Sequence, residues 1–187
     1  MSFFIPGRTT CAICECAIEH RWQAAQLPFA DPAEIGDLAT LARRYVHRSC
    51  WDGWSARERY SQSAMSLIAR SQAQLGEGSG VDQAQRIAWR DVPALKSFRV
   101  EDLMVLVTFD IAWADACRVA DWLRDAVSLP TVESLGLPVE TWQLRRDGGR
   151  IELVRLQADE PIEVIEVSPD RLMRWASVVG QLRDVHR

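Results

Sequence analysis

Two pairs of metal-ligating side chains constrain this chain more than any other feature of its sequence. Cys11 and Cys14 form a Cys-x-x-Cys pair, and His47 and Cys50 repeat that spacing further along the chain. Zinc prefers a tetrahedron of thiolate and imidazole ligands. Cysteines three apart in a tight turn can reach one ion, and residues three apart in a first helical turn share a face. The two pairs therefore predict a structural zinc site with Cys11, Cys14, His47 and Cys50 as ligands.

The number and distribution of the cysteines favour metal binding over disulfides. The chain has five cysteines, and four of them lie in the first 50 residues. An odd count without a secretion signal argues against a disulfide framework. Two alternatives stay open: Cys16 or His20 replaces one of the four ligands, or the cysteines are free buried thiols beside a satisfied histidine.

With His47-x-x-Cys50 opening a helix, the paired motifs resemble a treble-clef zinc finger, which is similar to LIM-type half-sites. The resemblance covers residues 9–60. The chain departs from the pattern in two ways, because Glu15-Cys16 stands where a small residue usually follows the second cysteine and the spacer between the pairs is long. The resemblance implies a structural metal and no particular activity, since such modules bind nucleic acid, bind proteins or cleave DNA.

Composition along the chain predicts two domains. Residues 1–75 carry the Cys/His pairs and helical patterns, and residues 81–187 form a separate set of strands and helices. Between them, Gly76-Glu77-Gly78-Ser79-Gly80 has the composition of a flexible linker. We expect a treble-clef-like zinc module, a linker over 76–80 and an α+β domain.

In the first half, Asp31-Pro32 has the form of a helix start, with a capping side chain followed by proline at the first helical position. The pattern predicts a helix over 32–44, a short extended piece at Tyr45-Val46 and a long helix over about 48–73. Trp51 and Trp54 fall on the apolar face of that long helix, where core packing is expected.

The second half alternates between strand and helix patterns. The apolar run Leu103–Phe109 predicts a central strand, and Asp147-Gly148-Gly149 predicts a hairpin turn because such turns need positive φ. Ser168-Pro169-Asp170 caps a closing helix. In chain order we expect a strand over 103–109, a helix over 111–127 and a loop over 128–138. Two hairpin strands follow over 141–145 and 150–156, then a third strand over 162–167 and the closing helix over 168–182. The predicted fold class is α+β, with a small mostly antiparallel sheet and helices on one of its faces.

No residue constellation indicates a reaction. The chain has no Gly-rich phosphate loop, no Gly-x-Ser-x-Gly elbow and no zinc-deaminase pattern. Cys117 lies on the expected apolar face of a helix, so we expect a buried structural thiol rather than a nucleophile. Four ligands would close the zinc site, and closed sites are usually structural.

Charge and hydropathy narrow the class of partner. The net charge is −4, which disfavours a protein that mainly binds nucleic acid. No apolar stretch approaches the roughly 20 residues of a membrane span, and the first residues lack the features of a signal peptide. We therefore expect a cytoplasmic protein without a membrane partner.

The tryptophans and the acidic residues can be read in two ways. Trp113 and Trp175 are expected in the core, together with Trp51 and Trp54. Exposure of the other four as a cluster would indicate a protein-binding surface, because tryptophan is enriched at interfaces; they are Trp22, Trp89, Trp122 and Trp142. An acidic run is expected to be solvated, or else to engage a basic partner; it comprises Asp159, Glu160, Glu163, Glu166 and Asp170.

Three hypotheses on function follow. The first is a zinc-stabilised, non-catalytic protein-binding module, in its sharpest form a bacterial immunity or antitoxin-like inhibitor. The second is a zinc-dependent nucleic-acid-binding regulator, whose phosphate contacts would come from a group of arginines: Arg43, Arg44, Arg48, Arg57 and Arg59. The third is an enzyme of a class that the sequence does not indicate, which a deep polar pocket away from the zinc would favour.

Overall fold

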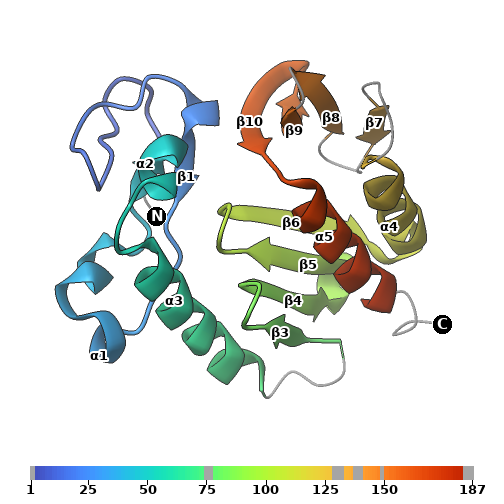
Figure 1. Cartoon of the computed structure of the whole chain (residues 1–187), viewed down its shortest axis with the longest axis horizontal. Helices are drawn as coiled ribbons and strands as arrows, with labels where there is room; N and C mark the ends of the chain where they lie inside the picture. Colours follow the sequence, from blue (N-terminus) through green and yellow to red (C-terminus); the bar gives the residue numbers. More distant parts are fainter. Residues whose placement is uncertain (1–2, 74–77, 128–132, 137–140, 148–149, 183–187) are drawn as a thin grey trace. The chain divides into compact units, whose positions relative to one another are not determined.

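The computed structural model describes residues 3–73, 78–127, 133–136, 141–147 and 150–182. Figure 1 shows the helices and strands of these residues, and their order is as follows. The elements are η1 (Arg21–Gln23), β1 (Ala24–Gln26), α1 (Pro32–Ile35), η2 (Gly36–Leu41), β2 (Tyr45–His47), α2 (Arg48–Asp52), α3 (Arg57–Gln72), β3 (Gly80–Asp82), β4 (Ile87–Val92), η3 (Pro93–Leu95), β5 (Ser97–Asp102), β6 (Val107–Ala112), η4 (Trp113–Asp115), α4 (Ala116–Asp125), β7 (Glu133–Gly136), β8 (Thr141–Asp147), β9 (Arg150–Gln157), β10 (Glu160–Glu166) and α5 (Pro169–Leu182).

The chain divides into two compact units. Unit 1 comprises Met1–Arg90 and Glu101–Thr108, and unit 2 comprises Asp91–Val100 and Phe109–Arg187. These bounds differ from the expected 1–75 and 81–187. Residues 74–77, which include the start of the expected 76–80 linker, lie outside the described part of the chain, and β3 begins at Gly80. A separating linker over 76–80 stays a prediction.

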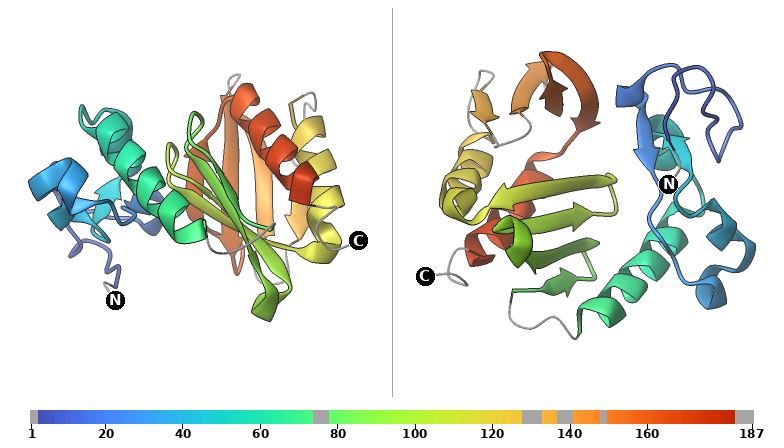
Figure 2. Two further views of the ribbon diagram at one scale, coloured as in Figure 1. Left: turned by 90° about the horizontal axis from the view of Figure 1, so that it is seen from below. Right: turned by 180° about the vertical axis from the view of Figure 1, so that it is seen from behind.

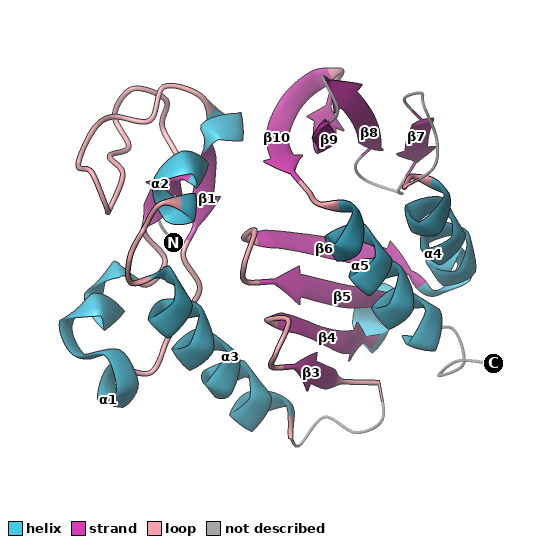
Figure 3. Ribbon diagram, in the orientation of Figure 1, coloured by secondary structure: helices cyan, strands magenta, loops and turns pink. Residues whose placement is uncertain are grey.

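Unit 1 packs its helices and a two-stranded sheet around one apolar core. β1 and β2 pair antiparallel, with Ala25 opposite Val46, so the short extended piece expected at Tyr45-Val46 is confirmed. Trp51 and Tyr60 are fully buried, and their rings meet edge to face. Figure 3 shows the long helix α3 together with shorter helices, short strands and loops in this part of the chain.

Both helices expected in unit 1 are shorter than their sequence patterns suggest. The Asp31 cap is present, because its carboxylate accepts a hydrogen bond from the Ala33 N–H at 2.9 Å, but the helix ends at Ile35 and a 3-10 segment continues to Leu41. The expected 48–73 helix is two helices, since α2 ends at Asp52 and α3 begins at Arg57. The break lets the Trp54 ring pack against both Trp51 and Tyr60.

A four-stranded sheet, in the order β3-β4-β5-β6, corrects the central-strand prediction. Of the run expected as a strand over 103–109, residues 103–106 form a turn, whereas residues 107–109 are strand, as expected. The turn lies between β5, which ends at Asp102, and β6, which begins at Val107. Its apolar side chains still pack inward: Leu103 is 4% exposed and belongs to the core of unit 1, whereas Met104, Val105 and Leu106 are half-buried, and Leu106 packs against that core. The apolar side chains of residues 103–106 reflect packing against the core. The turn conformation of these residues depends on hydrogen bonds to their carbonyls.

A second four-stranded antiparallel sheet lies in unit 2, in the order β10-β9-β8-β7. The hairpin expected over 141–145 and 150–156 is confirmed, since β8 and β9 pair antiparallel from Asp147↔Arg150 to Thr141↔Leu156. The third strand, expected at 162–167, is also confirmed as β10, which pairs with β9. These strands form a sheet that does not contain the strand at Val107–Ala112, contrary to the single sheet expected. Part of the loop expected over 128–138 is strand β7, and the rest lies outside the described residues.

Two helices complete unit 2. The capped closing helix is confirmed as α5, and the expected 111–127 helix is α4 preceded by a 3-10 turn over Trp113–Asp115. Figure 2 shows α4 and α5 side by side. Trp175 of α5 is fully buried, and its ring meets Phe109 edge to face. The fold class is α+β, as expected.

Candidate metal centre

A short hairpin over residues 9–18 presents the first ligand pair. The Thr10↔Ala17 bridge closes it, and the Cys11 N–H donates to the Cys16 carbonyl at 2.8 Å. At the tip, the Glu15 N–H donates to the Cys11 carbonyl at 2.9 Å, and Glu15 itself has a φ of 63°. A small residue is usual at this position in the resembled family, and the left-handed backbone gives the physical reason. The tight turn aims the Cys11 and Cys14 side chains to the same side.

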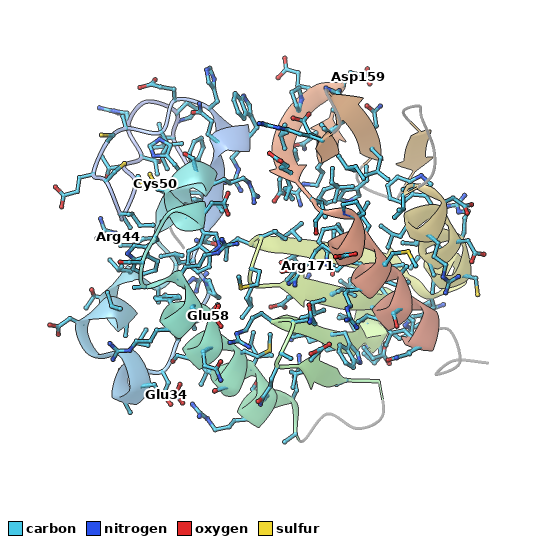
Figure 4. The ribbon with its side chains drawn as sticks, in the orientation of Figure 1. Glu34, Arg44, Cys50, Glu58, Asp159 and Arg171 are labelled. Carbon is cyan, nitrogen blue, oxygen red and sulfur yellow. The ribbon has the colours of Figure 1, made fainter. Side chains whose placement is uncertain are left out.

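The second ligand pair lies where β2 becomes α2. His47 is the last residue of β2 and the N-cap of α2, and Cys50 lies within the first turn of that helix. A backbone hydrogen bond from the Ala12 N–H to the Tyr45 carbonyl, at 2.8 Å, holds the first pair beside β2. Figure 4 marks Cys50 on α2. The strand and the helix therefore bring together ligands that lie far apart in the sequence.

The four side chains form one cluster. One ligand atom from each of Cys11, Cys14, His47 and Cys50 lies within 4.8 Å of all the others. The Nδ1 atom of His47 is 3.5 Å from the Cys14 Sγ and 3.8 Å from the Cys50 Sγ. In a tetrahedral site with Zn–S near 2.3 Å and Zn–N near 2.05 Å, sulfur and nitrogen ligands are separated by about 3.6 Å. The cluster could hold a metal ion.

Backbone N–H groups point at the sulfur atoms, as they would at thiolates. The Cys11 Sγ accepts from the His47 N–H at 3.3 Å and from the Ile13 N–H at 3.5 Å. A hydrogen bond from the Cys16 backbone lowers the pKa of the Cys14 thiol. Hydrogen bonds of this kind stabilise the charged form of a thiol, and the charged form is the metal ligand.

Burial acts in the opposite direction at Cys50. Burial raises the pKa of the Cys50 thiol to about 12, and the neighbouring Cys14 and Cys11 side chains add to the shift. A divalent cation reverses this balance, because a coordinating thiol is deprotonated outright. Cys11 is fully buried and Cys14 is exposed, so the cluster opens to solvent on the Cys14 side.

The two alternative ligands lie outside the cluster. Neither Cys16 nor His20 belongs to the group of side chains that could share an ion. Cys16 is exposed, and its thiol donates to the Cys14 carbonyl at 3.5 Å. The imidazole of His20 stacks on Trp22, with ring centroids 5.7 Å apart.

Three of the arginines considered for phosphate binding are engaged inside unit 1. Arg48 donates to the Val105 carbonyl at 2.8 Å, Arg57 to the Met104 carbonyl, and Arg59 to the Glu34 carbonyl at 2.8 Å. Arg43 and Arg44 are exposed. The hypothesis of a five-arginine phosphate surface therefore loses three of its members to backbone contacts.

Two other side chains differ in exposure from the sequence-based expectation. Cys117 is exposed, not buried, because the buried face of α4 is formed by Ala116, Val119, Ala120 and Leu123. Glu163 of the acidic run is 8% exposed and pairs with Arg155 at 3.4 Å, so that residue is not solvated.

The tryptophans divide differently from the expectation. Trp51 and Trp175 are buried as expected, whereas Trp54 and Trp113 are half-buried. Trp142 is buried, and Trp22 is exposed. The exposed cluster of Trp22, Trp89, Trp122 and Trp142 that would have indicated an interface is therefore not formed.

Unit 2 contains an apolar cavity. Its volume is about 20 Å³, and it is bordered by β5, β6, β8, β9, α4 and α5. Its lining includes three tryptophans, and every lining side chain is of an apolar type: Val100, Phe109, Ile111, Val119, Trp122, Leu123, Trp142, Leu153, Trp175 and Val179. This cavity is apolar, so it is not the deep polar pocket that would favour an enzyme.

Sequence reasoning did not single out most of the exposed apolar side chains of unit 1. Six large apolar side chains are exposed among the described residues, and four of them lie between residues 3 and 29: Phe3, Ile5, Trp22 and Phe29. For Phe3 and Ile5 the signal was the apolar start of the chain, which precedes the hairpin without belonging to any periodic pattern.

Comparison with known proteins gives no relative for this chain. No family model matches it, and no match was found among curated proteins or among solved structures. Among the described residues, no helix has the length and apolar character needed to cross a membrane.

Proposed function

We propose that Cys11, Cys14, His47 and Cys50 bind one zinc ion as a structural site. The observation that carries this proposal is the convergence of four ligand atoms within 4.8 Å. Three thiolates and one imidazole suit zinc, and a full set of four protein ligands leaves no open position for substrate. When bound, the ion would link the 9–18 hairpin to the start of α2, so that its binding free energy becomes folding free energy.

The treble-clef resemblance supports the same assignment. As in that family, the first pair lies in a tight hairpin and the second pair opens a helix. The left-handed Glu15 occupies the position where the family usually has a small residue. The long spacer between the pairs contains α1 and η2, which are held by the Asp31 cap and by hydrogen bonds to α3.

On function, we propose that unit 1 is a non-catalytic protein-binding module. Its support is the exposure of four large apolar side chains: Phe3, Ile5, Trp22 and Phe29. The Arg43 guanidinium lies over the ring of exposed Phe29, and Trp22 stacks on His20. Arg21 lies over the rings of Phe4 and Tyr45. Exposed aromatic side chains beside arginines are the composition of interface hot spots.

The sharpest form of the proposal is a bacterial immunity or antitoxin-like inhibitor that acts in the cytoplasm. Its support is the small size of the chain, its acidic net charge of −4, and the exposed apolar side chains of unit 1, the unit that carries the proposed metal site. Nucleic acid as the partner is disfavoured, because three of the five candidate arginines contact backbone carbonyls instead.

The test is recovery of a stoichiometric partner with the tagged full-length chain, followed by measurement of the dissociation constant. Replacing Trp22 and Phe29 together by alanine should weaken binding by about 30-fold or more, as expected for hot-spot residues. Leu95, which is 63% exposed in unit 2, provides a control, and Leu95→Ala should bind normally. Equal binding by the double variant, or recovery of nucleic acid in place of a protein, would contradict the proposal.

A further inference from the structure

The turn over 103–106 accepts hydrogen bonds from three side chains of the segment 48–57, which begins directly after the metal ligand His47. Met104 O accepts from the Trp51 indole N–H at 2.8 Å and also from the Arg57 guanidinium. Arg48 Nη1 donates to the carbonyls of Val105 at 2.8 Å and Leu106 at 3.4 Å. Three consecutive carbonyls of the turn thus take their donors from the segment 48–57.

Three N–H groups of the turn, those of Leu103, Met104 and Val105, donate to residues outside the segment 48–57. The fully buried carboxylate of Asp102 accepts from the Met104 N–H at 2.9 Å and from the Val105 N–H at 3.3 Å. The Leu103 N–H donates to the Arg86 carbonyl at 2.9 Å. Loss of the donors in 48–57 would therefore remove partners from the carbonyls while leaving those of the N–H groups in place.

The turn also contains a backbone conformation that its surroundings must maintain. Leu106 has a φ of 49°, in the left-handed region that disfavours any residue with a Cβ. Such conformations persist only where neighbouring contacts over-determine them. The carbonyl of Leu106 is one of the two held by Arg48, so the strained residue is itself part of the contact.

The donors depend on the metal ligands for their placement. Arg48 lies between His47 and Cys50, and Trp51 follows Cys50 directly. The helix α2 that carries them has only five residues, and a helix of that length is not stable by itself in water. Ligation of His47 and Cys50 would fix both ends of the segment from which Arg48 and Trp51 project.

We propose that metal occupancy of the Cys11/Cys14/His47/Cys50 cluster controls the conformation of the 103–106 turn. The inference rests on the proposed metal site and adds a conformational response to it. With the ion bound, α2 holds the three carbonyls and Leu106 stays left-handed. Without the ion, α2 loosens, the carbonyls lose the donors that α2 carries, Arg48 and Trp51, and the turn between β5 and β6 opens.

Hydrogen exchange measured by mass spectrometry tests whether metal removal opens the 103–106 turn. The full chain is compared as loaded with zinc and after treatment with a chelator under reducing conditions, and zinc content is measured on both samples. Amides over 103–107 should exchange at least about tenfold faster after metal removal, while those of β9 in unit 2 keep their rate. A chain that takes up no zinc refutes the proposed metal site. A chain that loses its zinc and keeps the same exchange over 103–107 refutes this inference alone.

If metal removal unfolds the whole of unit 1, the proposal is tested in reverse, by measuring how a change at the 103–106 turn affects the affinity for zinc. Coupling between two sites is symmetric, so weakening the contacts of the turn must weaken the metal site. Arg57→Gln removes a donor to Met104 O, together with the contacts of the Arg57 guanidinium with Asp52 and with the Trp51 ring of α2. It should raise the zinc dissociation constant about five-fold or more, measured by competition with a chromophoric chelator. Arg59→Gln makes the same charge change on α3 but removes a donor to Glu34 O, and it should leave the zinc affinity unchanged. Equal affinities in the two variants would overturn the inference.

Discussion

The Sγ atom of Cys14 lies 3.5 Å from the Nδ1 atom of His47, although 33 residues separate them in the chain. That separation is close to the sulfur–nitrogen distance across a tetrahedral zinc site, about 3.6 Å. The contact joins the hairpin over 9–18 to the start of α2, and it is the geometric basis of the proposed metal site.

Removal of a ligand should release the metal and destabilise unit 1. Cys50→Ser removes one thiolate of the four ligands, so we expect loss of bound zinc and a fall in the free energy of unfolding of more than about 4 kcal/mol. Cys16→Ser and Cys117→Ser remove exposed thiols outside the cluster, and both should keep the metal and the stability. Metal content and urea denaturation measure the two effects, and loss of metal in Cys16→Ser would reassign the ligands.

The backbone at Glu15 predicts a stabilising substitution. Its φ of 63° is a conformation that glycine adopts without steric cost. Glu15→Gly should therefore raise the free energy of unfolding by about 0.5–1 kcal/mol. Glu19→Gly provides a matched control, because Glu19 is an exposed glutamate of the same hairpin region without a positive φ, and it should not stabilise. Denaturant unfolding measures both variants. A lower free energy of unfolding in Glu15→Gly would contradict the prediction, because the Glu15 side chain would then stabilise the fold by more than its left-handed backbone conformation destabilises it.

Buried Tyr60 should make stability fall at high pH. Its hydroxyl donates to the Pro28 carbonyl at 2.9 Å, and burial raises its pKa to about 12, above the ordinary value of about 10. Between these values the unfolded chain has lost the proton and the folded chain keeps it, so the free energy of unfolding falls as pH rises from 10 to 12. Below pH 10 the group adds no pH dependence.

Tyr60→Phe separates the hydrogen bond from the titration. At neutral pH the variant should lose about 1 kcal/mol through the missing hydrogen bond. Its stability should fall less steeply than that of the wild type between pH 10 and 12, because the titrating group is gone. Parallel curves for the two proteins over that range would contradict the raised pKa.

The apolar cavity of unit 2 predicts that added volume stabilises. Val119 of α4 lines the cavity and is 5% exposed, so Val119→Ile should raise the free energy of unfolding by about 0.5–1 kcal/mol by filling space. Leu153→Ala enlarges the same cavity and should cost about 2–5 kcal/mol. Thermal unfolding measures both, and destabilisation by Val119→Ile would mean that the walls are already closely packed.

Local sequence signals predicted the parts of the fold that depend on a few adjacent residues. The Asp31 cap and the 141–156 hairpin were predicted because capping and turn residues act within three or four positions. The ligand pairs were found because Cys-x-x-Cys and His-x-x-Cys need a fixed spacing, and the four side chains do converge.

The wrong predictions concern features that depend on tertiary contacts. The run at 103–109 has the composition of a strand, but its first residues form a turn, since side chains of α2 and α3 bind its carbonyls. The break between α2 and α3 follows from packing of Trp54 against Trp51 and Tyr60. The exposure of Cys117 depends on which face of α4 meets the core, and a difference of one position in the periodic pattern reversed that assignment.

Metal analysis of the purified full-length chain by inductively coupled plasma mass spectrometry, with Cys50→Ser measured alongside, tests the central claim most directly. We predict about one zinc per chain in the wild type and none in the variant. A wild-type chain that contains no zinc, and takes up none when zinc is added under reducing conditions, would contradict the claim and leave Cys11, Cys14 and Cys50 as thiols without a metal.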